Sequence, residues 1–144
     1  MKKILVAVDL SDLAASLMEY AASQALAFGS SVKILYVEPP VPAFIGTEMS
    51  PPVSVEPSAE ESSRITDELA AMAKFLEDKG IEASYEYAHG PIIDTIVDKA
   101  RNEAADLLIV GAHSHGILYR AFIGSISAGL VKVSPCPVLL IRGK

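Results

Sequence analysis

Residues 107–125 read LLIVGAHSHGILYRAFIGS, and this stretch joins an apolar run to a short loop and then to the start of a helix. The run ends at Gly111, the loop contains Gly116, and the pair Gly124-Ser125 opens a helical pattern. Where a strand leads through small residues into a helix, unpaired backbone N–H groups and the positive end of the helix dipole converge. The stretch therefore predicts an anion site, and phosphate is the ligand we expect there.

Segments of strand length alternate with helical patterns along the whole chain. The strand segments cover residues 3–9, 32–37, 81–88, 107–111 and 137–142, and the helical patterns cover 11–29, 58–80, 91–105 and 125–134. Strands that are apolar on both faces are typical of parallel sheets covered by helices. With right-handed crossovers, this order predicts a three-layer α/β fold, Rossmann-like and doubly wound, whose open five-stranded parallel sheet has the strand order 3-2-1-4-5 and helices on both faces.

Helix start and stop signals support this division. Ser11 is a predicted N-cap and Gly29 a predicted stop for the first helix. Ser58 and Glu61 have the spacing of a capping box, which begins the second helix. Pro91 is expected at the first position of the third.

Residues 81–88 and 39–57 depart from the simple pattern. Residues 81–88 alternate apolar and polar side chains, so we expect an edge strand. Residues 39–57 hold six of the nine prolines and fit neither the helical nor the strand periodicity. We interpret residues 1–144 as a single domain with an irregular Pro-rich insertion at about 39–57. That insertion is either a solvated loop or a lid over a ligand.

Composition narrows the function classes. Cys136 is the only cysteine, so no internal disulfide can form. The formal charge of −6, without a basic stripe, argues against nucleic-acid binding. No apolar run has the length of a membrane span, and no signal-peptide pattern follows Met1, so we expect a cytoplasmic protein without membrane insertion.

The predicted topology selects the site before any motif is consulted. Ligands of open α/β sheets bind beyond the carboxyl ends of the strands, where the strand order reverses. A switch point between the first and fourth strands brings Asp9 next to Gly111, so the two should share a pocket. Asp9 could accept hydrogen bonds from a ribose or a base; alternatively it only stabilises a helix N-terminus.

The sequence supports metal binding and catalysis less well than it supports an anion site. His113 and His115 form an H-x-H pair, but no cysteine or third ligand accompanies it, so we expect loop residues near phosphate or solvent. A phosphate-binding G-x-x-x-x-G-K-[ST] loop, a nucleophile elbow and a G-x-G-x-x-G dinucleotide motif are all absent from the sequence. We expect a protein that is not an enzyme, or at most a slow ATPase.

Three segments resemble the universal stress protein family: ILVAVDLSD at 4–12, DLLIVGAHSHG at 106–116 and IGSISAGLVKVSPCPVLLI at 123–141. The ATP-binding branch of that family has Gly, two residues, Gly, nine residues, then Gly with Ser or Thr. Gly111 and Gly124-Ser125 match this spacing, whereas Ser114 replaces the second glycine. A serine adds a Cβ beside the phosphates and can restrict the site.

The resemblance implies a ligand, a site and a partner. ATP or AMP, with Mg²⁺ arriving on the nucleotide, is the implied ligand, and no organic redox cofactor is expected. It also implies a homodimer that forms through the last strand, 137–142. The implied nucleotide-binding residues are Ala7, Asp9, Ser11, Val37, Gly111, His113, Ser114, His115, Gly116, Gly124, Ser125 and Ile126.

Three functional hypotheses follow. The first is a dimeric nucleotide-binding switch or sensor in the stress response. The second is an interaction module of the same fold that does not bind nucleotide, for which Ser114 is the main evidence. The third is an enzyme that acts on an adenylated substrate.

Overall fold

The computed structural model describes residues 1–40, 58–112 and 126–142. Five parallel strands form one sheet in the order β3-β2-β1-β4-β5. The strands are β1 (Lys3–Val8), β2 (Ser31–Glu38), β3 (Ala83–His89), β4 (Leu107–Ala112) and β5 (Val138–Arg142). The predicted fold class and strand order are confirmed, and β3 is an edge strand.

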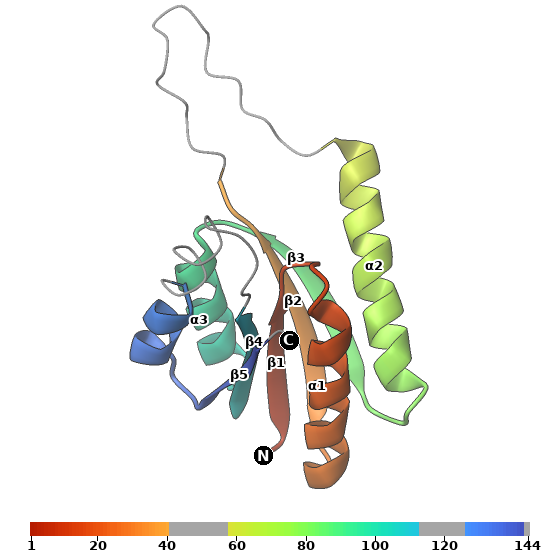
Figure 1. Cartoon of the computed structure of the whole chain (residues 1–144), viewed down its shortest axis with the longest axis vertical. Coiled ribbons are helices and arrows are strands. Elements are labelled where there is room, and N and C mark those ends of the chain that lie inside the picture. Colours follow the sequence, from red (N-terminus) through yellow and green to blue (C-terminus); the bar gives the residue numbers. More distant parts are fainter. Residues whose placement is uncertain (41–57, 113–125, 143–144) are drawn as a thin grey trace, which may run out of the picture.

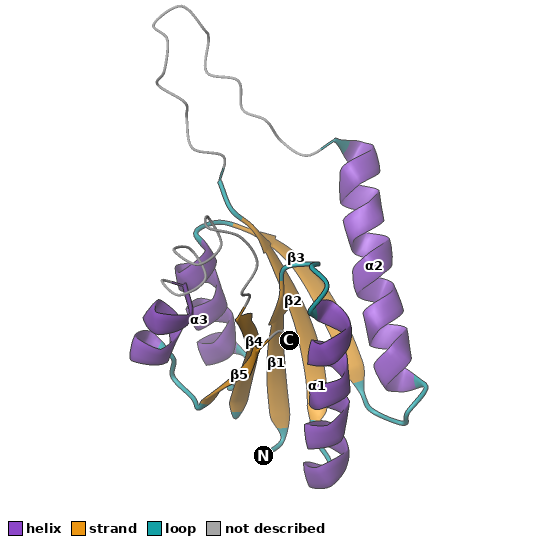
Figure 2. Cartoon of the chain, in the orientation of Figure 1, coloured by secondary structure: helices purple, strands orange, loops and turns teal. Residues whose placement is uncertain are grey.

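Helices cover both faces of the sheet. They are α1 (Ala14–Phe28), α2 (Ala59–Glu77) and α3 (Ile92–Asn102), and residues 126–133 are also helical. Figures 1 and 2 show α1 and α2 on one side of the sheet, with α3 and residues 126–133 on the other. No helix within the described ranges has the length and hydropathy needed to cross a membrane.

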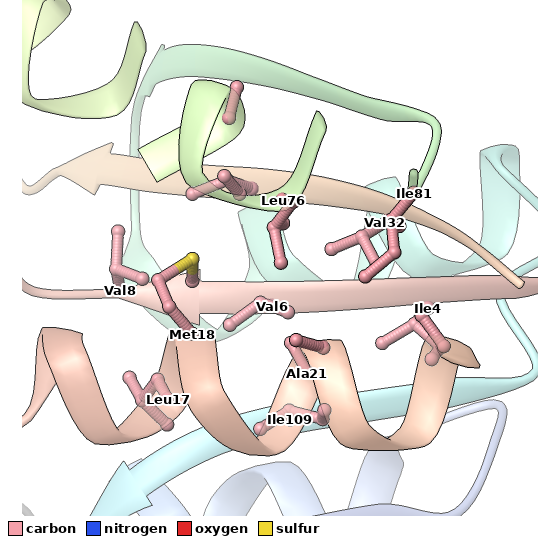
Figure 3. Packing of buried hydrophobic residues seen from close by; sticks show 14 of the residues in the cluster. Ile4, Val6, Val8, Leu17, Met18, Ala21, Val32, Leu76, Ile81 and Ile109 are labelled. Carbon is pink, nitrogen blue, oxygen red and sulfur yellow. The ribbon is translucent and has the colours of Figure 1, made fainter. Parts of the chain in front are cut away.

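The sheet separates two apolar clusters. On the α1 and α2 side, Leu17 and Met18 of α1 and Leu76 of α2 pack against Val6 and Ile109 of the central strands (Figure 3). On the other side, the buried residues of α3 pack with Leu130 on the opposite face of the same strands. Because β1 and β4 are buried on both faces, their near-continuous apolar sequence is explained.

The start of α1 differs from the prediction. Leu13, not Ser11, is the N-cap, and the helix begins at Ala14. Leu10 has a positive φ of 61°, and the backbone N–H of Ser11 donates to Asp9 Oδ1 at 3.1 Å, so a turn separates the strand from the helix. Within that turn Ser11 Oγ accepts from the N–H of Leu13 at 3.3 Å. The predicted stop is confirmed, since Gly29 adopts a left-handed conformation with φ 67°.

The other helix boundaries agree with the prediction to within a few residues. Ser58 caps α2 by accepting from the N–H of Glu61 at 3.1 Å. Pro91 is the N-cap of α3 and not its first residue. This helix ends at Asn102, before the predicted Ala105, because Ala104 turns to φ 51° and Ala105 N–H bonds back to the Ala100 carbonyl at 2.9 Å.

The last helical segment is only partly buried. Leu130 is fully buried, whereas the neighbouring Val131 is 57% exposed. Gly129 lies where a Cβ would approach Ile93 Cδ1 to 2.6 Å. The segment therefore contacts α3 closely along one narrow face and leaves its neighbouring valine outside that contact.

Candidate functional site

A pocket of about 190 Å³ lies at the carboxyl ends of β1, β2 and β4. Asp9 and Gly111 both line it, which confirms that the two strand exits share one pocket. The described lining residues are Ala7, Val8, Asp9, Leu17, Leu35, Tyr36, Val37, Pro39, Ile92, Ile96, Val110, Gly111, Ile126, Ser127 and Leu130. The pocket therefore draws on all three layers of the fold.

The hollow exists because β1 stops before its neighbours. Pairing of β1 ends at Val8 opposite Tyr36 on one side and at Ala7 opposite Val110 on the other. Meanwhile β2 stays paired with β3 as far as Glu38, and β4 with β5 as far as Ala112. The central strand ends before both of its neighbours, so the sheet is notched at the switch point.

One backbone acceptor faces this notch. Successive residues of a parallel strand direct their N–H and C=O groups to alternate neighbours. Ser31 N–H bonds to Lys2 on the β1 side and Val32 N–H bonds to Glu82 on the β3 side, so odd-numbered residues of β2 face β1. The carbonyl of Val37 therefore points to the place where β1 has already ended.

The walls of the pocket are mostly apolar. Leu17 contributes from the α1 side, and Leu35, Ile92, Ile96 and Leu130 contribute from the α3 side. Such walls suit a flat aromatic ring, while a few polar groups at the rim fix its orientation.

Three polar side chains belong to the described lining, those of Asp9, Tyr36 and Ser127. The Tyr36 hydroxyl donates to Glu38 Oε2 at 3.1 Å, and the Tyr87 hydroxyl donates to Glu38 Oε1 at 3.2 Å. Burial raises the pKa of Tyr36, and the negative charges of Glu38 and Asp9 raise it further. Burial and Glu38 also raise the pKa of Tyr87. Both phenols therefore stay protonated at neutral pH.

Gly111 lines the pocket, and its lack of a side chain also allows close packing against α1. A Cβ added there would lie 3.1 Å from Leu13 Cδ1 and 3.6 Å from Leu17 Cδ1. The missing side chain therefore lets the first turn of α1 lie against the end of β4. This contact explains the glycine without any ligand.

The structure places the predicted site residues in three groups. Ala7, Asp9, Val37, Gly111 and Ile126 line the pocket. Ser11 does not line it and instead bonds within the turn before α1. The remainder, His113, Ser114, His115, Gly116, Gly124 and Ser125, lie outside the described residues.

Sequence reasoning missed several lining residues. Tyr36 directly precedes the predicted Val37, so the same strand exit could have indicated it. Ile92, Ile96 and Leu130 have only the pattern of core residues, and no local signal distinguishes a pocket wall from a core. In the part of the chain that the structure describes, no three His, Cys, Asp or Glu side chains form a group that could hold a metal ion.

The model of the universal stress protein family matches residues 1–142. The chain belongs to this family. A universal stress protein of Thermus aquaticus is 28% identical over 141 residues, which cover 98% of each protein. The solved structure of universal stress protein UspA from Lactobacillus plantarum matches this chain with a TM-score of 0.79 and 27% identity. The match covers 98% of this chain and 97% of the UspA chain. Whole-length similarity thus accompanies the shared fold.

Some solved universal stress protein structures contain nucleotides. The protein from Archaeoglobus fulgidus was solved in complex with dAMP (TM-score 0.70, 21% identity, 98% of each chain). Another family member was solved in complex with cAMP (TM-score 0.73, 22% identity), and one from Arabidopsis thaliana with AMP bound (TM-score 0.61, 21% identity). These three structures cover 98%, 99% and 100% of this chain, respectively.

Proposed function

We propose that this universal stress protein binds an adenine nucleotide, AMP or ATP, in the pocket at the end of β1. The observation that carries the proposal is the notch itself, with apolar walls on both sides, the Val37 carbonyl at one edge and Asp9 at another. An adenine ring needs flat apolar walls and an acceptor for its amino group, and Asp9 suits a ribose. Nucleotides bound to other family members support the same ligand class.

The size of the pocket favours the adenosine end of the ligand. Sites for small molecules typically enclose roughly 300–1,000 Å³, so a pocket of about 190 Å³ takes a part of a nucleotide. We assign the phosphates to residues 113–126 on the sequence argument. Only Ile126 of these is described, and it lines the pocket.

A binding role fits the described lining better than catalysis does. Phosphoryl transfer depends on cations that neutralise the phosphate and on a group that orients the attacking water. Among the described lining residues the only ionisable side chains are Asp9 and Tyr36. We propose a nucleotide-responsive switch or sensor that hydrolyses ATP slowly at most; multiple turnovers that disappear in an Asp9→Asn variant would contradict this.

Ligand release and thermal shift test the binding proposal. The purified protein is denatured, and the released small molecules are identified by mass spectrometry. Separately, melting is measured with AMP, with ATP, and with ATP plus Mg²⁺. At 100 times its dissociation constant, a ligand should raise the melting temperature by about 5–10 °C. Release of no nucleotide together with unchanged melting would favour the interaction module.

The second part of the proposal is a homodimer through β5. This edge strand presents Leu140, which is 39% exposed, and Val131 and Val133 of the preceding helical segment are exposed as well. An uncovered apolar edge is a template for pairing with another strand, and most homo-oligomers have closed symmetry. Leu140→Glu should convert the dimer to a monomer in analytical ultracentrifugation. Tyr85→Glu is the matched control, because Tyr85 is 41% exposed on the opposite edge strand.

A further inference from the structure

Tyr36 is the one aromatic residue among the described lining of the pocket. It lies on β2 two residues after Ile34, and both belong to the α1 and α2 face of the sheet, where Tyr36 packs against the apolar cluster. Its hydroxyl reaches the carboxyl end of the strand and donates to Glu38 Oε2 at 3.1 Å. The ring is thus fixed at its base by packing and at its tip by a hydrogen bond.

Glu38 is itself held from several sides. Its other carboxylate oxygen accepts from Tyr87 at 3.2 Å, and its backbone carbonyl accepts from the N–H of Gly90 at 3.0 Å. The rings of Tyr36 and Tyr87 meet edge to face, with centroids 5.3 Å apart. A residue held in this way orients the Tyr36 hydroxyl without help from a ligand.

The hydrogen bond decides what Tyr36 can offer a ligand. Its one proton is directed to Glu38, so only lone pairs of the phenol oxygen remain. Asp9 lines the same pocket and supplies a second acceptor. This corner of the pocket therefore selects a ligand group with hydrogen-bond donors, and on an adenine nucleotide the ribose hydroxyls are such donors.

We propose that Tyr36 is a specificity-determining residue that accepts a hydrogen bond from a ribose hydroxyl of the bound nucleotide. This inference rests on the proposed function, because it concerns the same pocket. Tyr87 supplies a matched control: it makes an equivalent bond to Glu38 but is absent from the described lining. Tyr36→Phe and Tyr87→Phe each remove one phenol from Glu38, and only the first changes the pocket.

The experiment compares AMP with 2′,3′-dideoxy-AMP, which lacks both hydroxyls, by titration calorimetry. The wild-type protein should bind AMP more tightly than the dideoxy compound. In Tyr36→Phe the ratio of the two affinities should fall about 5-fold, since one hydrogen bond contributes about 1 kcal/mol, and the remaining preference for AMP belongs to Asp9. The affinity for the dideoxy compound should stay unchanged. Tyr87→Phe should keep the wild-type ratio. Urea midpoints of both variants establish that they are folded.

The possible failures separate the two proposals. A wild-type protein that binds neither compound overturns the proposed function and this inference with it. Normal AMP binding with the wild-type ratio in Tyr36→Phe overturns only this inference. An equal decrease of the AMP-to-dideoxy affinity ratio in Tyr36→Phe and Tyr87→Phe also overturns only this inference, because the effect would then act through Glu38 and not through a contact with Tyr36.

Discussion

The two ends of the sheet carry hollows of similar size but opposite chemistry. The pocket at the carboxyl ends of the strands measures about 190 Å³, and a second one, at the amino ends, measures about 150 Å³. Lys33, Glu82 and Glu103 are among the residues that line the second hollow, together with Lys3 and Ser84. Size alone therefore does not indicate which end binds a ligand.

At the amino ends several charged groups are paired within the chain. Lys33 Nζ lies 2.9 Å from Glu86 Oε1 and 2.7 Å from Glu103 Oε1, and Glu86 also pairs with Lys99. The carboxylate of Asp106 accepts from the backbone N–H groups of Lys2 and Lys3. Polar groups that are paired within the chain stabilise the fold. At the carboxyl ends the notch in the sheet instead leaves an apolar cavity with acceptors at its rim, which is an arrangement for binding.

The largest expected effect on AMP affinity comes from filling the carboxyl-end pocket, whereas filling the amino-end hollow should have none. Ala7 lines the carboxyl-end pocket, and Ala105 lines the amino-end hollow. Ala7→Leu should occupy the space of the adenine ring and weaken AMP binding by about 100-fold or more, which corresponds to about 2.7 kcal/mol. Ala105→Leu should leave the affinity at the wild-type value. Equal losses in calorimetric titrations of the two variants would contradict this distinction between the hollows.

Removal of Lys33 should affect stability and not binding. Lys33→Ala leaves Glu103 without this partner and Glu86 with Lys99 alone. These side chains are partly exposed, so we expect a loss of about 1–2 kcal/mol in the free energy of unfolding. Lys74→Ala is the control, because its pair with Asp78 is fully on the surface and should cost less than about 0.5 kcal/mol. Urea denaturation with and without AMP measures both quantities.

The same ion pairs predict how stability depends on pH. Hydrogen bonds from Lys99 and Lys33 lower the pKa of Glu86 below its ordinary 4.5, and a hydrogen bond from Lys33 lowers that of Glu103. Below about pH 5 the unfolded chain therefore binds more protons than the folded one. The stabilisation is complete above that pH and is lost as the pH falls through the lowered folded-state values. Lys33→Ala should make this decline shallower in urea titrations between pH 5 and 3.

The sequence predicts the sheet well because each strand carries its own signal. Apolar runs at β1 and β4 reflect burial on two faces, and the alternation with helices specifies the crossovers. The switch point then follows from topology, which is how Asp9 and Gly111 could be assigned to one pocket. The sequence thus predicts features that follow from the pattern of one element or from the order of the elements.

Individual side-chain contacts between distant elements, and unusual backbone conformations, cannot be predicted from the sequence in this way. Lys33 and Glu103 are 70 residues apart, so no local pattern indicates their ion pair. The start of α1 depends on a positive φ at Leu10, a conformation that a leucine does not favour. The hydrogen bonds of Tyr36 and Tyr87 to Glu38 depend on the register of β2 against β3, which brings Tyr87 opposite Tyr36.

Gly111→Ala should have the smallest effect of these substitutions, and it tests whether the glycine serves packing or ligand binding. If the glycine serves the packing of α1, then Gly111→Ala forces Leu13 to move by a few tenths of an ångström, because a Cβ would lie 3.1 Å from its Cδ1. We expect a cost below about 1 kcal/mol in unfolding free energy, because the end of a leucine side chain can shift. AMP affinity should then change less than about 3-fold, since that Cβ points to α1. A large loss of affinity at unchanged stability would instead show that the ligand approaches the Gly111 backbone, and packing would no longer account for the residue.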